Sequence, residues 1–367
     1  TEKWHKSMYD PACIATREAM KDVCRFWLDK GCDGFRVDMA DSLVKHDDAN
    51  KSGTVAVWQD ILGDIHAEYP ESAFVSEWGK AEQSIKAGFD MDFYLDWMGN
   101  GYNSLVRDYE AHLNAFASLP ESLDDSTENN SFFKADSKGT CDHFIDEYMG
   151  RYEQIKDKGA IALITGNHDT TRISYGLSED ELKLAYAFFL TMPGNPFIYY
   201  GDEIAMSFRS MASKEGGFTR TGSRTPMQWN DSPNGGFSEH TPWLGVNPNY
   251  KLINAENQMN DDSSVFRFYQ NLIALRKEHP VMAHGDFKLC CPEDGPVIAY
   301  TRSYQDETWL AVHNFSASMQ KFHYGAEDIE LPCNTPVIIS NYGENEVEYG
   351  IGTLVLKPYE TVVFQLH

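Results

Sequence analysis

The feature that most constrains the fold is a series of short apolar runs, each ending in a group of polar or charged residues. Helical patterns with an apolar face lie between several of these runs, so strands and helices alternate along the chain. This alternation predicts an α/β fold with a parallel sheet. The expected strands are residues 32–38, 72–77, 91–95, 160–165 and 196–200, and the expected helices are 16–30, 54–69, 179–190 and 264–279.

After Pro280 the pattern changes to short β-rich segments separated by turn residues. We therefore expect two domains, an α/β barrel portion over residues 1–284 and an antiparallel β-sandwich over residues 285–367. Trp309 is the only Trp of the second domain, and a core position is favoured for it over a carbohydrate-binding one. Residues 118–140 are expected to form a surface loop, and residues 209–250 a structured excursion from the barrel rim.

Composition excludes some classes of partner. The formal net charge is −25 and no basic stretch is present, so nucleic acid is not an expected partner. The sequence contains no run of 18 apolar residues, so no membrane span is expected. The seven cysteines are expected to be reduced thiols, which slightly favours a reducing compartment such as the cytoplasm, although a periplasmic or secreted location stays open. The oligomeric state is not predicted.

Arg36 and Asp38 lie at the tip of the strand in the segment GFRVD. Residues two apart on a strand face the same side, so both side chains are expected to point into the barrel mouth. A neighbouring guanidinium favours the charged form of a carboxyl group, which suits a nucleophile. By itself, the motif could equally be an ion pair that holds the rim.

Glu77 ends the next apolar strand, in the segment FVSEW, beside Trp78. An apolar surround disfavours a charged carboxylate, which suits a general acid. A solvated Glu at a strand end is the alternative interpretation of this motif.

Asn167, His168 and Asp169 follow the strand AIALIT directly. Catalytic residues of eight-stranded barrels gather at the carboxyl ends of the strands. Three carboxylates on one rim suit glycoside cleavage, which needs an acid and a nucleophile or base and passes through a positively charged transition state.

The segments GFRVDMA, SEW and TGNHD resemble the second, third and fourth conserved regions of the α-amylase superfamily, glycoside hydrolase family 13. The resemblance implies an eight-stranded (β/α) TIM barrel and a retaining mechanism. It also implies that Asp38 is the nucleophile, Glu77 the acid/base and Asp169 the stabiliser of the transition state. The expected separation of the first two carboxyl groups is roughly 5–5.5 Å.

By the same resemblance, Arg36 orients Asp38 and His168 binds hydroxyls of the reacting sugar, while Trp78 and Asn167 are further expected substrate contacts. The segment IYYGDEIAM resembles the eighth strand and its loop, where Asp202 and Glu203 are expected to be structural. The segment GSRTPMQWN is similar to that of α-glucosidases, oligo-1,6-glucosidases and trehalose synthases. Its Arg224 and Trp229 could shape the cleft or simply pack.

The first conserved region of the superfamily has no match here, so the chain is expected to begin just before the fourth barrel strand. The expected activity is hydrolysis of α-glucosidic bonds in α-glucans or malto- and isomalto-oligosaccharides. A sugar acceptor in place of water would give a transglycosylase or isomerase, and an inactive truncated fragment is a further alternative. No cofactor is required by this chemistry; a calcium site is possible but is not supported by these residues. Preference for α-1,4 or α-1,6 linkages stays open.

Overall fold

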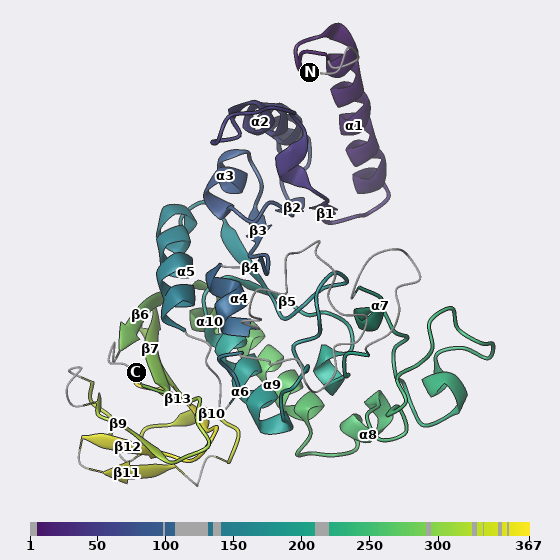
Figure 1. The fold of residues 1–367 in the computed structure, drawn as a ribbon. Coiled ribbons are helices and arrows are strands. Elements are labelled where there is room, and N and C mark those ends of the chain that lie inside the picture. Colours follow the sequence, from purple (N-terminus) through teal and green to yellow (C-terminus); the bar gives the residue numbers. More distant parts are fainter. Residues whose placement is uncertain are drawn as a thin grey trace. The chain divides into compact units, whose positions relative to one another are not determined.

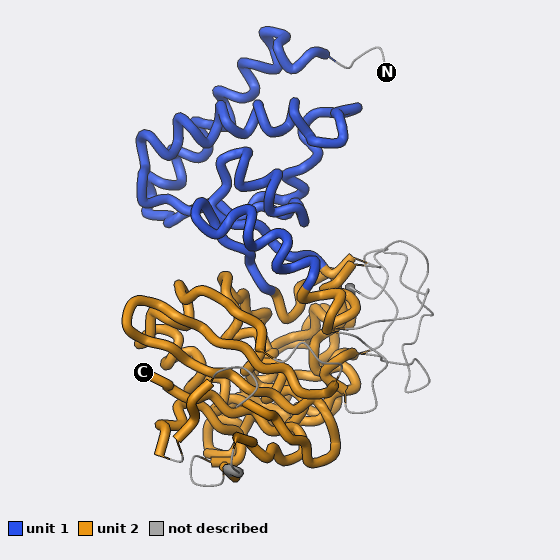
Figure 2. Tube along the Cα trace, turned by 90° about the vertical axis from the view of Figure 1, so that its left-hand side faces the viewer, with its two compact units in different colours: residues 1–95, 146–163 blue, residues 96–145, 164–367 orange. Residues whose placement is uncertain are grey.

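The computed structural model describes the greater part of the chain, which divides into two compact units (Figure 2). Unit 1 holds residues 1–95 and 146–163, and unit 2 holds residues 96–145 and 164–367. The described residues are 6–97, 100–106, 131–134, 141–209, 220–290, 295–324, 329–332, 334–343, 347–350 and 352–367.

The strands of unit 1 are parallel and follow the chain order β1-β2-β3-β4 (Figure 1). The register places Gly34 opposite Ala73 and Val37 opposite Ser76, so β1 and β2 end level with each other. Polar residues that follow these two strands are therefore neighbours. The strands are β1 (Gly34–Val37), β2 (Ala73–Ser76), β3 (Met91–Phe93) and β4 (Ala160–Ile164).

The short apolar run over residues 32–38 is typical of a buried parallel strand, but β1 is only partly buried. Among the described strands β1 pairs with β2 alone, and its residues are half-buried or exposed. β2, with a neighbour on each side, is buried from Phe74 to Ser76. The position of a strand in its sheet, and not the apolar character of its sequence, decides this difference.

The helices of unit 1 lie close to their expected positions and have recognisable caps. Asp10 accepts a hydrogen bond from the N–H of Ala12 at the start of α1, and Asp47 accepts from Gly53 and Thr54 at the start of α2. A helix over residues 142–155 was not expected from the sequence. The helices are α1 (Pro11–Asp29), α2 (Ser52–Glu68) and α3 (Ala81–Lys86), with a short 3₁₀ turn η1 (Ala40–Ser42); α5 (Asp142–Ile155) belongs to unit 1 from residue 146 onward.

α1 does not bury the face that its apolar periodicity suggests. Lys21 and Leu28 are its buried residues, whereas Val23, Phe26 and Trp27 are exposed. The Lys21 ammonium lies 2.6 Å from the Asp64 carboxylate of α2 and 2.9 Å from that of Glu18. Charge pairing therefore attaches α1 to α2. The apolar core of unit 1 lies instead around α2 and β2, with Trp58, Phe74, Trp78 and Phe89 as its large members.

The first part of unit 2 is mainly helical. α6 begins with a complete capping box, in which Ser178 and Glu181 each accept a hydrogen bond from the other's backbone N–H. The elements are α4 (Gly101–Val106), α6 (Glu179–Thr191), β5 (Asn195–Phe197), η2 (Asp202–Ile204), α7 (Arg220–Ser223), η3 (Pro233–Gly236), α8 (Ala255–Met259), α9 (Val265–Glu278) and α10 (Pro280–His284).

The C-terminal part forms two antiparallel sheets, as expected. One has the order β10-β13-β8-β7-β6 and the other β11-β12-β9, and side chains such as Leu310, Phe322, Leu354 and Phe364 share one core. The strands are β6 (Asp286–Cys290), β7 (Val297–Tyr304), β8 (Glu307–Asn314), β9 (Gln320–Phe322), β10 (Val337–Ser340), β11 (Glu348–Gly350), β12 (Thr353–Leu356) and β13 (Thr361–Gln365).

The remaining expectations concern Trp309, two connecting segments, the cysteines and the domain boundary. Trp309 is buried, as favoured. Of the expected loop 118–140, only residues 131–134 lie within the described part, and of the excursion 209–250 residues 209 and 220–250 do. Five of the seven cysteines lie in the described part, and all five are free thiols. The domain boundary at residue 285 stays a prediction.

Candidate active site

Arg36 and Asp38 lie at the carboxyl end of β1, where the strand pattern placed them. Arg36 Nη1 donates to Asp38 Oδ1 at 2.5 Å. The Asp38 side chain keeps 73% of its surface exposed. Its carboxylate is therefore paired and, within unit 1, open to a molecule that arrives from solvent.

Glu77 follows β2 and meets the same guanidinium. Arg36 Nη2 lies 2.8 Å from Glu77 Oε1, and the Glu77 side chain is only 17% exposed. A planar guanidinium presents several donors in fixed directions, so one arginine can hold two carboxylates at once. Arg36 joins Asp38 and Glu77 in this way, and the sequence had suggested it only for Asp38.

The turn after β1 makes further hydrogen bonds with Glu77. Met39 adopts a left-handed backbone conformation, with φ 42° and ψ 45°, and its N–H donates to Glu77 Oε2 at 3.1 Å. The backbone N–H of Ala40 donates to the Glu77 carbonyl oxygen at 3.2 Å. Both the carboxylate and the backbone of Glu77 are thus anchored to the segment that carries Asp38.

Trp78 is placed by packing. Its ring is 2% exposed in the core of unit 1, lies edge-on to Phe89, and its Nε1 donates to Gln83 Oε1 at 3.1 Å. In the structure the Trp78 side chain stabilises the strand end behind Glu77. Its expected contact with substrate stays a prediction.

In unit 2, the tight turn after β4 carries Asn167, His168 and Asp169. The Asn167 side-chain oxygen accepts a hydrogen bond from the N–H of Asp169 at 2.8 Å, so Asn167 shapes the turn. His168 Nε2 lies 3.5 Å from Asp169 Oδ2, and both side chains are partly exposed. An imidazole and a carboxylate side by side can share the hydroxyl groups of one sugar as donor and acceptor.

Arg224 joins this turn from a distant part of the sequence. Its Nη2 donates to Asp169 Oδ1 at 2.9 Å, and its Nε donates to the backbone oxygen of His168 at 2.8 Å. The sequence left open whether Arg224 shapes the cleft or simply packs. In the structure it contacts two of the expected site residues. Trp229, its neighbour in the same motif, is exposed.

A buried layer of polar residues supports the turn. Arg172 and Asp202 form an ion pair at 3.1 Å with both side chains fully buried, and Thr165 donates to Asp202 Oδ2 at 2.6 Å. The Ser223 hydroxyl donates to the Thr170 backbone oxygen, and the Ser223 backbone oxygen accepts from Arg172 Nη2 at 3.2 Å. This layer fixes the segment before Arg224 to the turn of Asp169. Asp202 is therefore structural, as expected.

The candidate residues thus form two groups, one in each unit. Arg36, Asp38 and Glu77 are brought together in unit 1, and His168, Asp169 and Arg224 are brought together in unit 2. The convergence of both groups on one sugar stays a prediction.

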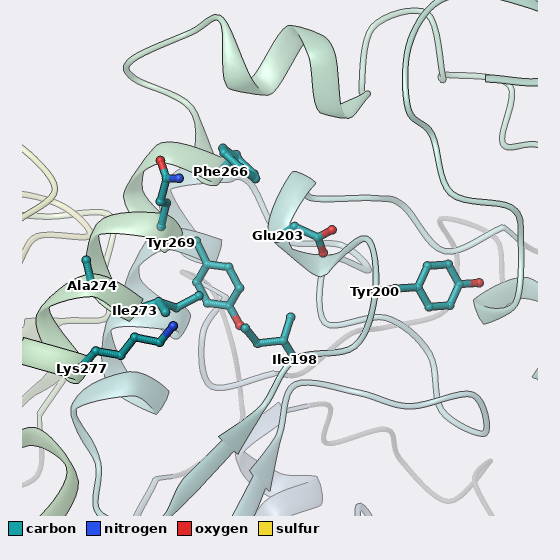
Figure 3. A pocket seen from close by; sticks show the side chains of 9 residues that line it. Ile198, Tyr200, Glu203, Phe266, Tyr269, Ile273, Ala274 and Lys277 are labelled. Carbon is teal, nitrogen blue, oxygen red and sulfur yellow. The ribbon is translucent and has the colours of Figure 1, made fainter. Parts of the chain in front are cut away.

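Unit 2 also contains a hollow of about 620 Å³ between α9 and the segment that follows β5 (Figure 3). Burial raises the pKa of Glu203, which borders it, and Glu203 Oε2 accepts no hydrogen bond from the described residues. None of the predicted site residues borders this hollow. Its lining consists of Ile198, Tyr200, Glu203, Phe266, Tyr269, Gln270, Ile273, Ala274 and Lys277.

Among the described residues, no three His, Cys, Asp or Glu side chains are grouped so that they could hold a metal ion. The same part of the chain has no helix with both the length and the apolar character that a membrane crossing demands.

Comparison with known proteins places the chain in a family. Residues 11–285 match the family model described as alpha amylase, catalytic domain, and residues 297–363 match the alpha-amylase SusG C-terminal domain. This chain belongs to the α-amylase family of glycoside hydrolases. The resemblance inferred from the three strand-end motifs is thereby confirmed, as is the barrel-type fold class with its C-terminal β-domain.

Among curated proteins, the chain is 31% identical to the probable oligo-1,6-glucosidase 3 of Bacillus subtilis, over 95% of this chain and 68% of that protein. It is 28% identical to the oligo-1,6-glucosidase of Halalkalibacterium halodurans, with the same shares covered. The trehalose-6-phosphate hydrolase of Escherichia coli is 27% identical, over 95% of this chain and 67% of that protein.

Solved structures agree on the fold. The trehalose-6-phosphate hydrolase of Bacillus licheniformis superposes with a TM-score of 0.76 at 24% identity, over 96% of this chain and 68% of that one. A trehalulose synthase mutant superposes with a TM-score of 0.73 at 24% identity, also over 96% and 68%.

Proposed function

We propose that this glycoside hydrolase is a retaining α-glucosidase that acts on short α-linked glucosides, with Asp38 as the nucleophile and Glu77 as the acid/base. The observation that carries the proposal is the bridge from Arg36 to both carboxylates. Retaining enzymes need their two carboxyl groups close together, whereas inverting enzymes need room for a water molecule between them. One guanidinium in contact with both groups suits the closer arrangement.

In the first step, a carboxylate oxygen of Asp38 attacks the anomeric carbon and forms an ester bond to the sugar. The glycosidic carbon–oxygen bond breaks, and Glu77 gives its proton to the leaving oxygen. In the second step, Glu77 takes a proton from water, the water oxygen bonds to the anomeric carbon, and the ester bond to Asp38 breaks. Two inversions restore the α configuration.

The remaining residues act on charge and position. Asp169 is proposed to stabilise the positive charge that develops on the sugar ring in both transition states. His168 is proposed to bind sugar hydroxyls beside Asp169, and Arg36 to keep Asp38 and Glu77 in register with each other. Asn167 acts through the turn that it shapes, and Trp78 through the strand end that it packs.

The proposed substrate class is inferred from the curated relatives. The curated relatives named above are oligo-1,6-glucosidases and a trehalose-6-phosphate hydrolase. We infer that short α-glucosides, in preference to polymers, are the substrates of this protein. A partner beyond the substrate, and a metal cofactor, are not part of the proposed chemistry.

The test separates the two carboxylate roles by the stereochemistry of azide products. In Asp38→Gly the enzyme nucleophile is absent, and azide can attack an activated aryl α-glucoside directly from the opposite face to give β-glucosyl azide. In Glu77→Gly the ester with Asp38 still forms, and azide then displaces it to give α-glucosyl azide. Nuclear magnetic resonance distinguishes the two anomers. Equal product anomers from both variants, or undiminished hydrolysis by Asp38→Gly, would contradict the assignments.

The same intermediate can also be captured by a sugar. Incubation of the wild-type protein with maltose distinguishes the outcomes: glucose alone indicates hydrolysis, whereas trehalose or longer saccharides indicate transfer. We expect glucose as the main product.

A further inference from the structure

Asp92 is a carboxylate that the proposed mechanism does not use, and it lies directly behind Glu77. It occupies the middle of β3, opposite Ser76 of β2 in the parallel register. Its side chain is 1% exposed. A buried carboxyl group one strand away from a catalytic one calls for an explanation.

Asp92 contacts the two residues that flank Glu77 in the sequence. Its Oδ1 accepts a hydrogen bond from the Ser76 hydroxyl at 2.6 Å and another from the backbone N–H of Trp78 at 3.0 Å. In the sheet β2 lies between β1, which carries Arg36, and β3, which carries Asp92. Asp92 therefore holds the residues before and after Glu77 from the side away from Arg36.

Other groups complete this support. The Ser76 hydroxyl also lies 2.6 Å from the Ser84 hydroxyl of α3. Arg151 of α5 donates to the backbone oxygen of Gly79 at 2.7 Å and pairs with Glu147. Residues 76–79 are thus fixed at both ends of the turn that follows Glu77.

The burial of Asp92 contributes unfavourably to the free energy of folding. Its Oδ2 is buried and accepts no hydrogen bond from the described residues. Burial raises the pKa of Asp92 to about 7, while the bonds from Ser76 and from the backbone N–H groups of Trp78 and Gly79, and the charge of Arg151, act in the opposite direction. Burying a carboxyl group is unfavourable even when it accepts several hydrogen bonds, and stability alone does not account for it.

We propose that Asp92 is a positioning residue for the acid/base: by holding Ser76 and Trp78 it sets the direction in which Glu77 leaves the strand toward Arg36 and the Met39 N–H. This inference rests on the proposed role of Glu77. It predicts that loss of Asp92 impairs proton donation to the leaving group and leaves attack by Asp38 intact.

The experiment compares kcat/KM, which reports formation of the glycosyl-enzyme, for two substrates. Maltose needs a proton on its leaving oxygen, whereas α-glucosyl fluoride has a leaving group that departs with little help. For Asp92→Ala we expect kcat/KM to fall about 10²-fold with maltose and less than about 3-fold with the fluoride. Asp92→Asn keeps an acceptor oxygen for Ser76 and Trp78, so it should stay within about 3-fold of wild type with both substrates.

Asp90 offers a matched control on the same strand pair. Its Oδ2 accepts the backbone N–H of Phe74 at 2.7 Å, near the opposite end of β2 from Glu77. Asp90→Ala removes the same kind of bond and should leave the ratio of the two kcat/KM values unchanged. If Asp92→Ala does not fold, Ser76→Ala provides the second variant, because it removes one of the two bonds to Asp92, and a smaller selective loss with maltose is expected.

Glu77→Ala, assayed in parallel, separates the two levels of inference. A selective loss with maltose in Glu77→Ala but not in the Asp92 or Ser76 variants overturns the role of Asp92 and leaves that of Glu77 standing. Equal losses on both substrates in Asp92→Ala also overturn it. If Glu77→Ala itself shows no selective loss, the proposed function is wrong.

Discussion

The guanidinium of Arg224 lies 2.9 Å from the carboxylate of Asp169, a residue 55 positions earlier in the chain. A second bond from the same side chain reaches the backbone oxygen of His168. Arg224 therefore holds the carboxylate and the turn that bears it with one rigid group.

This geometry predicts the effect of Arg224→Met. Asp169 is proposed to act mainly in the transition state, so a misplaced carboxylate should lower kcat by about 10²-fold with little change in KM. Arg224→Lys should recover only part of the loss, because an ammonium cannot make both bonds in the same plane. Steady-state kinetics with maltose measure both effects.

Arg209→Met is the control for that substitution, since Arg209 donates to the backbone oxygens of Gly245 and Val246 in the same unit. It should retain wild-type kcat. A kcat for Arg224→Met equal to that of the control would exclude a role for Arg224 in catalysis.

Breaking the buried ion pair of Arg172 and Asp202 should lower the stability of the fold. Arg172→Met leaves the Asp202 carboxylate buried without its charge partner, which should lower the free energy of unfolding by about 3–5 kcal/mol. The double variant Arg172→Met with Asp202→Asn should be more stable than the single one. Urea unfolding measures these differences. Lys156→Met, which removes an exposed ion pair, is the control and should lower the free energy of unfolding by less than about 1 kcal/mol. A single variant as stable as the control would show that the pair adds nothing.

His313 predicts how unit 2 responds to acid. It lies fully buried between the Tyr300 hydroxyl at 3.1 Å and the Thr361 hydroxyl at 2.7 Å, and burial lowers its pKa to about 3. The unfolded chain therefore binds a proton below about pH 6.5 that the folded chain does not accept, and stability falls as the pH falls through this window. Between pH 7 and pH 4 this residue alone should contribute a loss of about 3 kcal/mol.

The measurement is the urea midpoint against pH for wild type, His313→Gln and the exposed-site variant His240→Asn. His313→Gln should be less stable at pH 7 but should lose less stability on acidification. Parallel curves for wild type and His313→Gln would refute this explanation.

Removal of metal ions tests the proposal that carboxylate chemistry suffices. Dialysis of the protein against EDTA should leave kcat and KM for maltose unchanged, because neither step of the mechanism uses a metal. Loss of activity that Ca²⁺ alone restores would instead reveal a structural ion.

The strand-end residues could be predicted because each interrupts an apolar run with charge. Asp38 and Glu77 stand directly after such runs, and Asp169 follows the run AIALIT at the end of a short turn. Arg36 was also within reach, since its spacing from Asp38 matches the strand repeat. The partner that Arg36 finds in Glu77 depends on which strands are neighbours, and the local pattern does not contain that information.

The supporting residues were harder to predict. Asp92 stands inside an apparently apolar strand, and its meaning appears only when the register sets it opposite Ser76. Arg224 and Arg172 act across long sequence separations. The exposure of the apolar face of α1 could not be predicted either, because helical periodicity shows which residues share a face but not which face meets a neighbour. The helix over residues 142–155 did carry an apolar repeat in Phe144, Ile145, Tyr148 and Tyr152, so its signal was available.

The backbone of Met39 has a consequence for protein engineering. Its amide reaches Glu77 because the residue adopts a conformation that costs most side chains about 1 kcal/mol, while its own side chain is 61% exposed. The contact with Glu77 is made by the main chain of residue 39, so its side chain can be varied, with glycine and asparagine included, while that contact is kept.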